Sequence, residues 1–147
     1  MRVESILPVA QQRMITIQAN GSLVEAAKLL LDTHRALLIV CDEDGVMAGV
    51  ITKTDIVRQV ARHDGVVDNI PISSVMTEAV TSCREEDALH DVLALMKKNG
   101  VVHIPIVDQN SRPRGVVNAR DALQALLREV KDEELVLRAY VMGVGYR

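Results

Sequence analysis

The feature that most constrains the fold of this chain is a seven-residue segment that occurs twice. GVITKTD at residues 49–55 returns as GVVNARD at residues 115–121, displaced by 66 positions (115 minus 49). The same offset aligns further identical residues without a gap: Ile6 with Ile72, Val9 with Val75, Leu23 with Leu89, Leu29 with Leu95, Asp42 with Asp108 and Arg62 with Arg128. So regular a duplication predicts two copies of one supersecondary unit, which bury their apolar faces against each other. We expect function to reside where the copies meet.

The hydrophobic pattern predicts the order strand, helix, strand, strand, helix in each copy. In the first copy these elements are expected at residues 14–17, 22–32, 36–41, 46–51 and 52–62. In the second copy they are expected at residues 79–83, 87–99, 102–107, 115–117 and 119–131. The predicted fold class is therefore α/β (α+β), with a first repeat at residues 1–64, a second at 65–131 and a C-terminal tail at 132–147. The tail has no counterpart in the first copy, and we expect it to pack on the module or on a dimer partner.

Composition excludes several classes of partner. Hydrophobic residues make up 48% of the chain without any Phe or Trp, so the core must be aliphatic. A net charge of -3 with interspersed signs offers no basic field for nucleic acid, and aromatic stacking platforms are missing. No apolar run approaches the roughly 18 residues of a membrane span, and the opening MRVE does not resemble a signal peptide. We therefore expect a cytoplasmic protein that binds neither nucleic acid nor membrane.

The residues that carry metal or nucleophilic chemistry lack the spacing that such chemistry needs. Cys41 and Cys83 are each predicted to be small buried hydrophobic residues, because each lies in an apolar strand-like setting. His34, His63 and His90 are not spaced as metal ligands and are predicted to be exposed. No nucleophile has a recognisable base, so the sequence predicts neither an enzyme nor a metal site.

The two heptads resemble those of the CBS domain, the module named after cystathionine β-synthase. The resemblance rests on the heptads, on VHIPIVD at residues 102–108 and on VMT at residues 75–77, and it covers residues from about 5 to 131. It implies a tandem pair of repeats packed sheet to sheet with pseudo-twofold symmetry. It also implies two clefts that bind adenosine-containing ligands and thereby regulate an attached or separate partner.

The resemblance implies two ligand sites, each combining the heptad of one copy with strands of the other. The first would consist of Thr52, Lys53, Asp55, Val80, Thr81, Ser82, Val102 and His103. The second would consist of Asn118, Arg120, Asp121, Ile15, Thr16, Leu37 and Leu38. The resemblance assigns Asp55 and Asp121 to the ribose diol, and adenine would be held by aliphatic side chains.

The same residues have ordinary structural interpretations, which the sequence leaves open. Thr52 and Asp55 are also a helix start of the capping-box type, and His103 is either a phosphate-contacting base or a surface histidine. The second site departs from the family pattern at Asn118 and Leu37. Only Arg120 is close enough in sequence to replace the base lost there, so we expect unequal sites, the first more favourable to phosphate.

The sequence thus predicts a stand-alone regulatory module, a homodimer that senses energy status through AMP, ADP or ATP. S-adenosylmethionine and NAD are further candidate ligands, no cofactor is required, and the regulated protein is a separate, unidentified partner. The alternative is a ligand-free dimerisation module whose heptads only cap helices.

Overall fold

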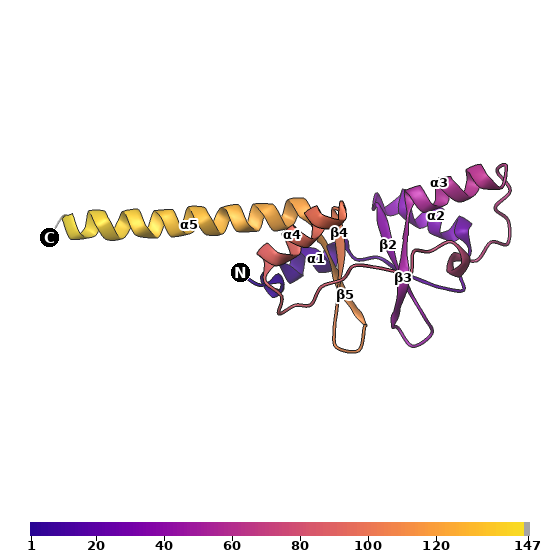
Figure 1. Cartoon of the computed structure of the whole chain (residues 1–147), viewed down its shortest axis with the longest axis horizontal. Coiled ribbons are helices and arrows are strands. Elements are labelled where there is room, and N and C mark those ends of the chain that lie inside the picture. Colours follow the sequence, from indigo (N-terminus) through magenta and orange to yellow (C-terminus); the bar gives the residue numbers. More distant parts are fainter. Residues whose placement is uncertain (146–147) are drawn as a thin grey trace.

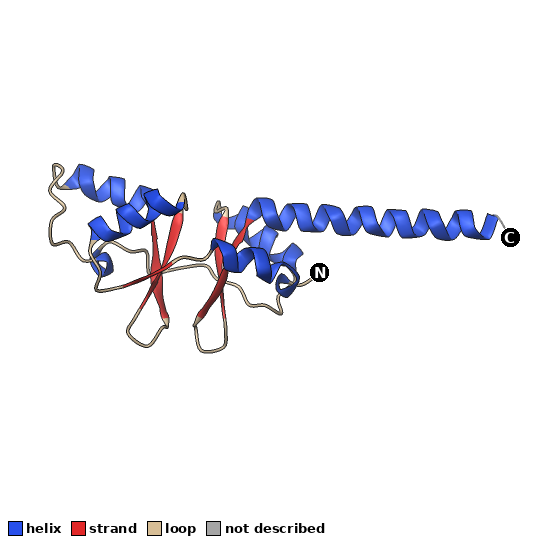
Figure 2. Ribbon diagram, turned by 180° about the vertical axis from the view of Figure 1, so that it is seen from behind, coloured by secondary structure: helices blue, strands red, loops and turns tan. Residues whose placement is uncertain are grey.

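The computed structural model describes residues 1–145 and consists of two units whose sheets face each other, with helices on the outer sides (Figures 1 and 2). The first unit contains β1 (Thr16–Gln18), α2 (Leu23–Thr33), β2 (Leu37–Cys41), β3 (Met47–Thr52) and α3 (Lys53–Arg62). The second contains α4 (Leu89–Asn99), β4 (His103–Val107), β5 (Pro113–Asn118) and α5 (Ala119–Gly145). Three further elements precede the repeats: η1 (Val3–Ile6), α1 (Leu7–Arg13) and η2 (Ile72–Ser74). The predicted fold class, with two copies packed sheet to sheet, is confirmed.

The two antiparallel hairpins, β2–β3 and β4–β5, repeat each other in detail. Both have a register shift at the same place, after Val40 in one copy and after Ile106 in the other. In the first turn, Oδ1 of Asp42 accepts hydrogen bonds from the backbone N–H groups two and four residues later, at 2.9 and 3.0 Å. Asp108 accepts the same two bonds at 2.8 and 3.0 Å. These repeated aspartates therefore shape turns, which explains why they recur at the same offset.

The leading strand forms in the first copy only. There, β1 lies parallel to β2, and the N–H of Ile39 donates to the carbonyl oxygen of Ile15 at 2.9 Å. The residue 66 positions after Ile39 is Pro105, which has no N–H to donate. The strand predicted at residues 79–83 is accordingly wrong: it is reduced to a bridge at Cys83, whose N–H and C=O each bond to β4 at 2.9 Å.

The two copies exchange the segments that precede them. The N-terminal segment η1–α1 packs on the second copy, where Val3, Ile6 and Ala10 join the core formed by α4, β4, β5 and α5 (Figure 1). Reciprocally, Ile72 of η2 is fully buried in the core of the first copy. The third cluster, around Ile39, joins the two sheets. Each unit of packing therefore contains a piece of the other sequence repeat, which the sequence pattern did not predict.

This exchange explains the glycine that opens each heptad. A Cβ on Gly49 would lie 2.5 Å from the carbonyl oxygen of Thr77, and a Cβ on Gly115 would lie 3.0 Å from the backbone of Ala10. Thr77 is held there by two backbone hydrogen bonds with Val50, at 3.0 and 2.8 Å. Both glycines thus allow the exchanged segment to approach the second strand of the hairpin more closely than any side chain would permit.

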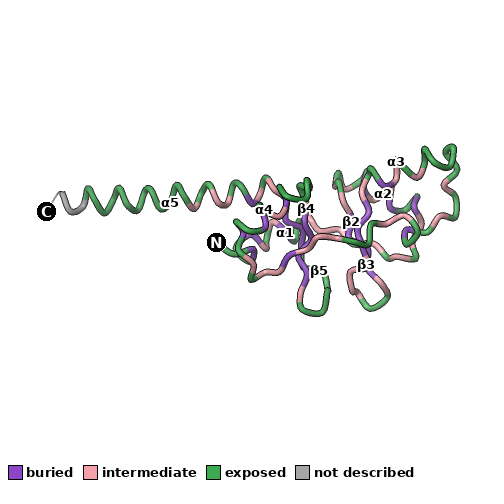
Figure 3. The backbone as a smooth tube through the Cα atoms, viewed as in Figure 1, coloured by how far each residue is buried: buried purple, intermediate pink, exposed green. Residues whose placement is uncertain are grey.

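Helix α5 is longer than predicted. It continues past residue 131, where the pattern predicted its end, to Gly145. It projects from the body of the molecule, and its residues 132–142 are exposed (Figure 3). The segment has no Gly or Pro before residue 143, and an ion pair between Glu134 and Arg138 at 2.7 Å stabilises one turn. The tail predicted at 132–147 is therefore mostly a continuation of this helix, and its residues 146 and 147 lie outside the described residues.

The predicted burial of the cysteines and exposure of the histidines are confirmed. Cys41 and Cys83 are buried and free, and burial raises the pKa of the Cys83 thiol to about 12, so this thiol is unreactive at neutral pH. His34, His63 and His90 are exposed. Across residues 1–145, none of the helices combines the length and hydropathy that a membrane crossing requires.

We predict that Gly49→Ala lowers the free energy of unfolding by about 1–3 kcal/mol, because the added methyl group displaces the exchanged segment. Gly115→Ala should cost less, since its nearest atoms lie 3.0 Å away rather than 2.5 Å. Urea denaturation of both variants and the wild type measures their free energies of unfolding. A Gly49→Ala variant as stable as the wild type would contradict the described contact with Thr77.

Candidate functional site

The first heptad places its polar residues at the start of α3. Oγ1 of Thr52 accepts a hydrogen bond from the N–H of Asp55 at 3.2 Å, and Oδ2 of Asp55 accepts one from the N–H of Thr52 at 2.9 Å. This is the capping box that the sequence left open as an alternative. Oδ1 of Asp55 has only a long contact of 3.5 Å to Arg58. Because a carboxylate offers about four acceptor sites, Asp55 can cap the helix and still accept further hydrogen bonds.

A cleft of about 670 Å³ lies beside this helix start and is lined by both copies. It brings together seven of the eight residues predicted for the first site: Thr52, Lys53, Asp55, Val80, Thr81, Val102 and His103. Ser82 does not line it. Further lining residues that the sequence reasoning missed are Ala36, Leu37, Val50, Thr54, Thr77, Ala79, Gly100, Val101 and Pro105. Of these, Leu37 was predicted for the second site.

Several of the missed residues had a usable signal in the sequence. Val50 and Thr54 lie within the heptad itself, and Ala79 adjoins the predicted leading segment. Thr77 belongs to the VMT segment at residues 75–77 that supports the family resemblance, but its place in the cleft depends on the exchange of segments between the copies. The walls are mostly aliphatic, and the charged groups are Asp55 within the wall and Lys53 at an exposed position. The cleft therefore suits a ligand with an apolar face and a few polar contacts.

The second heptad is arranged differently, because Asp121 already has a partner. Oδ1 of Asn118 caps α5 by accepting hydrogen bonds from the N–H groups of Arg120 and Asp121, at 2.9 and 3.3 Å. The carboxylate of Asp121 is bound by the guanidinium of Arg13 through two hydrogen bonds, of which the Nη2–Oδ1 bond is 2.9 Å long. The base near the second heptad is thus Arg13, whereas the sequence predicted Arg120, whose side chain is exposed.

The exchange of segments explains this correction. Arg13 is the last residue of α1, which packs on the second copy beside β5. Its counterpart at the same offset is Ala79, which lines the first cleft. Equivalent positions are thus occupied by Arg13 beside the second heptad and by the much smaller Ala79 beside the first.

The other residues predicted for the second site lie in different surroundings. Leu38 is fully buried and Ile15 packs beside it in the core of the first copy, while Thr16 is exposed on β1. Leu37 is half-buried and lines a small cavity of about 110 Å³ as well as the first cleft. The surroundings of the two heptads therefore differ, and the expected preference of the first site for phosphate stays a prediction.

His103 lies between the two heptads and is half-buried. Its Nε2 is 3.1 Å from Nδ2 of Asn118, and because Oδ1 of that residue caps α5, Nδ2 is the donor and Nε2 the acceptor. Burial lowers the pKa of His103, the positive charge of Arg13 lowers it further, and Asp121 partly opposes this. An added negative charge nearby would favour the protonated form.

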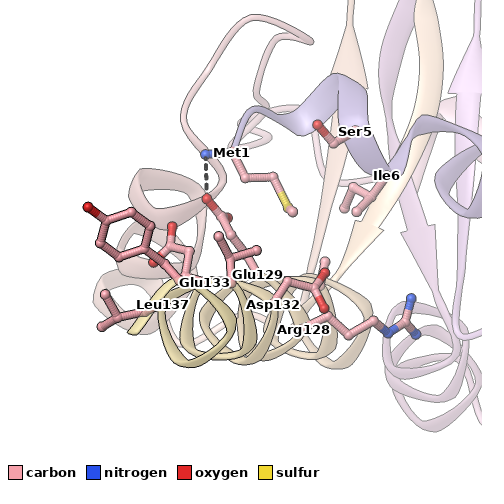
Figure 4. Close-up of a pocket in the computed structure, with 11 residues that line it drawn as sticks. Met1, Ser5, Ile6, Arg128, Glu129, Asp132, Glu133 and Leu137 are labelled. Carbon is pink, nitrogen blue, oxygen red and sulfur yellow. Dashed lines mark ion pairs between the residues drawn. The ribbon is translucent and has the colours of Figure 1, made fainter. Parts of the chain in front are cut away.

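A groove of about 890 Å³ lies apart from both heptads, between the N-terminal segment and α5 (Figure 4). The amino group of Met1 forms an ion pair with Glu129 across it, at 3.7 Å. The groove contains no heptad residue and no residue of the first copy's strands or helices. The first cleft is therefore the candidate ligand site.

Solved structures with the same fold support this description. The crystal structure of the CBS domain pair of protein MJ0100, in complex with 5′-methylthioadenosine and S-adenosyl-L-methionine, matches with a TM-score of 0.74 at 28% identity, covering 88% of this chain and 98% of that chain. A CBS-domain-containing protein from Agrobacterium tumefaciens matches with a TM-score of 0.73 at 26% identity, covering 84% and 92%.

Relatives by sequence include both a small protein and parts of enzymes. An uncharacterized 17.7 kDa protein of Acidianus ambivalens is 32% identical over 81% of this chain and 71% of its own length. The L-aspartate semialdehyde sulfurtransferase of Methanocaldococcus jannaschii is 32% identical over 73% of this chain, which spans only 20% of that enzyme. The CBS domain model itself matches residues 3–62 and 72–128. Because the two matches cover both repeats, the chain belongs to the CBS-domain family and is a tandem CBS domain pair.

Proposed function

We propose that this chain is a regulatory module that binds an adenosine-containing ligand in the first cleft. The observation that carries the proposal is the cleft itself, about 670 Å³ in volume and lined by both copies around Asp55. This volume lies within the range of about 300–1,000 Å³ that is usual for small-molecule sites. The solved CBS pair that holds 5′-methylthioadenosine and S-adenosyl-L-methionine supports the adenosyl class of ligand.

The proposed contacts follow from the chemistry of the lining. Oδ1 of Asp55, which the helix cap does not use, accepts hydrogen bonds from the ribose diol. Adenine lies against the aliphatic side chains of Val50, Val80 and Val102. A phosphate group lies toward Lys53 and the strand residue His103. AMP, ADP and ATP are the leading candidates, with S-adenosylmethionine and NAD as alternatives.

Ligand occupancy would be transmitted because the cleft spans both copies. A ligand that contacts α3 of one copy and β4 of the other stabilises one relative arrangement of the two sheets. Such a shift requires the ligand to bind one arrangement more tightly than another. Competition among AMP, ADP and ATP would then make the arrangement report energy status to a separate partner protein. We propose that the second heptad does not bind the ribose of a ligand, since Arg13 binds Asp121.

The alternative function, a ligand-free dimerisation module, is favoured by one observation. Asp55 and Thr52 form a complete capping box without any ligand, so the heptad has a structural role in either case. The two functions differ in whether a ligand raises the thermal stability of the chain.

We also propose that two copies associate through α5. Five exposed apolar residues form a stripe along this helix: Leu123, Leu127, Val130, Leu137 and Val141. With Glu134 included, successive members of the stripe are separated by 4, 3, 4, 3 and 4 residues, the spacing of a coiled-coil seam. This order is the same in both directions, so an antiparallel second copy meets the stripe in register.

We predict that Asp55→Asn weakens binding of AMP and adenosine by roughly tenfold or more, since a hydrogen bond to a charged group contributes about 1.5–3 kcal/mol. Asn retains an acceptor for the helix cap, so the melting temperature should change little. Titration calorimetry measures the affinities of both proteins for adenosine, AMP, ADP, ATP, NAD, 5′-methylthioadenosine and S-adenosylmethionine. Asp121→Asn is the matched control and should leave the affinity for adenosine, which has no phosphate, unchanged. If no ligand binds or raises the melting temperature, the alternative function stands.

We predict that the free chain loses stability as the pH falls below about 6.5, and that His103→Gln loses less. The pKa of His103 is lowered in the folded state, whereas the unfolded chain keeps the ordinary value of 6.5. Above that pH the imidazole is neutral in both states; below it the unfolded state binds the proton first. Urea denaturation at about pH 7.5 and about pH 5.5 measures the difference. An identical pH dependence in both proteins would contradict the described environment.

We predict that Leu137→Glu weakens self-association by roughly tenfold or more, because it places a charge in the apolar seam. Leu31→Glu, at a similarly exposed leucine of α2, is the control and should have no effect. Sedimentation velocity over a concentration series measures the dissociation constant. A wild-type chain that remains monomeric throughout would refute the proposed dimer.

A further inference from the structure

The groove between the N-terminal segment and α5 has a mostly apolar lining (Figure 4). Ile6 is buried beneath it, whereas Val136, Leu137 and Tyr140 of α5 are between 63% and 70% exposed. The chain has no Phe or Trp, and Tyr140 is the one tyrosine in its described part. Exposed apolar patches mark interaction sites, and tyrosine is a frequent anchor of protein interfaces. The groove therefore has the composition of a docking surface.

The charged residues beside this apolar surface are mainly acidic. Glu129, Asp132 and Glu133 contribute three carboxylates, against the guanidinium of Arg128 and the amino group of Met1. Glu129 pairs with that amino group at 3.7 Å. None of the ion pairs among the described side chains involves Asp132 or Glu133. Two carboxylates next to the apolar lining are therefore available to cations of a partner.

The backbone around the groove favours a helical occupant. The lining comes from the N-terminal segment and from α5, and it includes no strand residue in the described part of the chain. An extended peptide would find no sheet edge to pair with there, whereas a helix satisfies its own N–H and C=O groups. From residue 125 to residue 140 the groove follows α5 for about 22 Å, at 1.5 Å per residue. A helix of about 15 residues matches this length.

Position and charge argue against a second copy of α5 as the occupant. Ala125, Glu129, Asp132 and Val136 line the groove at intervals of 4, 3 and 4 residues, so they form one row along the helix. At 3.6 residues per turn, this row lies on nearly the opposite side of α5 from the apolar stripe proposed for the dimer, with Leu137 at the border of both. A second α5 packed against this row would place carboxylates against carboxylates. A basic partner complements the groove better.

We infer that this groove binds a basic amphipathic helix of a partner protein. The apolar face of that helix would contact Ile6, Val136 and Tyr140, and its lysines or arginines would pair with Asp132 and Glu133. The inference rests on the proposed function in one respect, because it takes the docked partner to be the protein that the ligand regulates. Such a partner would be attached to α5, whose first turn is capped by Asn118 at the second heptad.

Fluorescence anisotropy with labelled peptides of about 15 residues tests the groove on the full chain. The first peptide carries leucines on one face of a helix and lysines on the other. The second has glutamates in place of the lysines, and the third has the composition of the first in a shuffled order. The wild type should bind the first peptide at least roughly tenfold more tightly than either of the others.

Two exposed residues of the groove offer variants that keep the core intact. Tyr140→Ser should weaken binding of the leucine–lysine peptide roughly tenfold, because it removes the aromatic anchor. Asp132→Lys should weaken it roughly fivefold in dilute salt and less in concentrated salt. Asp68→Lys makes the same change of net charge at an exposed position between α3 and η2, and it should behave as the wild type.

Four results would contradict the inference. They are no binding of any peptide, equal binding of the lysine and glutamate peptides, an equal effect of Asp132→Lys and Asp68→Lys, and a loss of self-association in Tyr140→Ser that matches its loss of peptide binding. The last result, measured by sedimentation velocity, would assign the groove to a second copy.

The peptide titrations contain no nucleotide, so they are independent of the proposed function. If the leucine–lysine peptide binds as expected and no adenosyl ligand binds, the docking groove stands and the proposed function fails. If AMP binds and the peptide does not, only the groove is refuted.

Discussion

The close backbone contact at the first residue of each heptad determines how the rest of the chain is arranged. Gly49 lies against Thr77 and Gly115 against Ala10, so each hairpin accepts the segment that precedes the other copy. Because η1–α1 and η2 each complete the core of the opposite copy, neither repeat could bury its apolar face alone. The reciprocal exchange ties the two copies together and fixes which residues from each reach the junction between them.

The difference between the two heptad sites follows from one pair of exchanged positions. The segment that precedes the second copy places Ala79 in the first cleft, and this small side chain leaves the approach to Asp55 open. The segment that precedes the first copy places Arg13 beside the second heptad, where its guanidinium binds Asp121. The sequence predicted unequal sites from Leu37 and Asn118, with the first more favourable to phosphate, and that preference stays a prediction. Asn118 in fact caps α5 as well as a threonine would.

The parts of the fold that the sequence predicted are those set by local patterns. The hairpins and the helix starts follow from hydrophobic periodicity and from the doubled heptad, whereas the lining of the first cleft was implied by the resemblance to the CBS domain. The strand at residues 79–83 failed because the amide missing at Pro105 acts on a segment far away in sequence. Arg13 was missed for a similar reason, since its partner is 108 positions away and only the exchange brings them together. The end of α5 was missed because the repeat, which gave the boundary, does not extend into the tail.

The position of His103 connects the proposed ligand site with helix α5. Its Nε2 accepts a hydrogen bond from Asn118, the residue that caps this helix. An anion near His103 would favour the imidazolium form, which cannot accept that bond, so Asn118 would have to turn or release it. Any such movement acts on the first turn of α5, next to the ion pair of Asp121 with Arg13. The same helix carries the apolar stripe proposed for dimer contact, so the ligand and the partner copy would act on one rigid element.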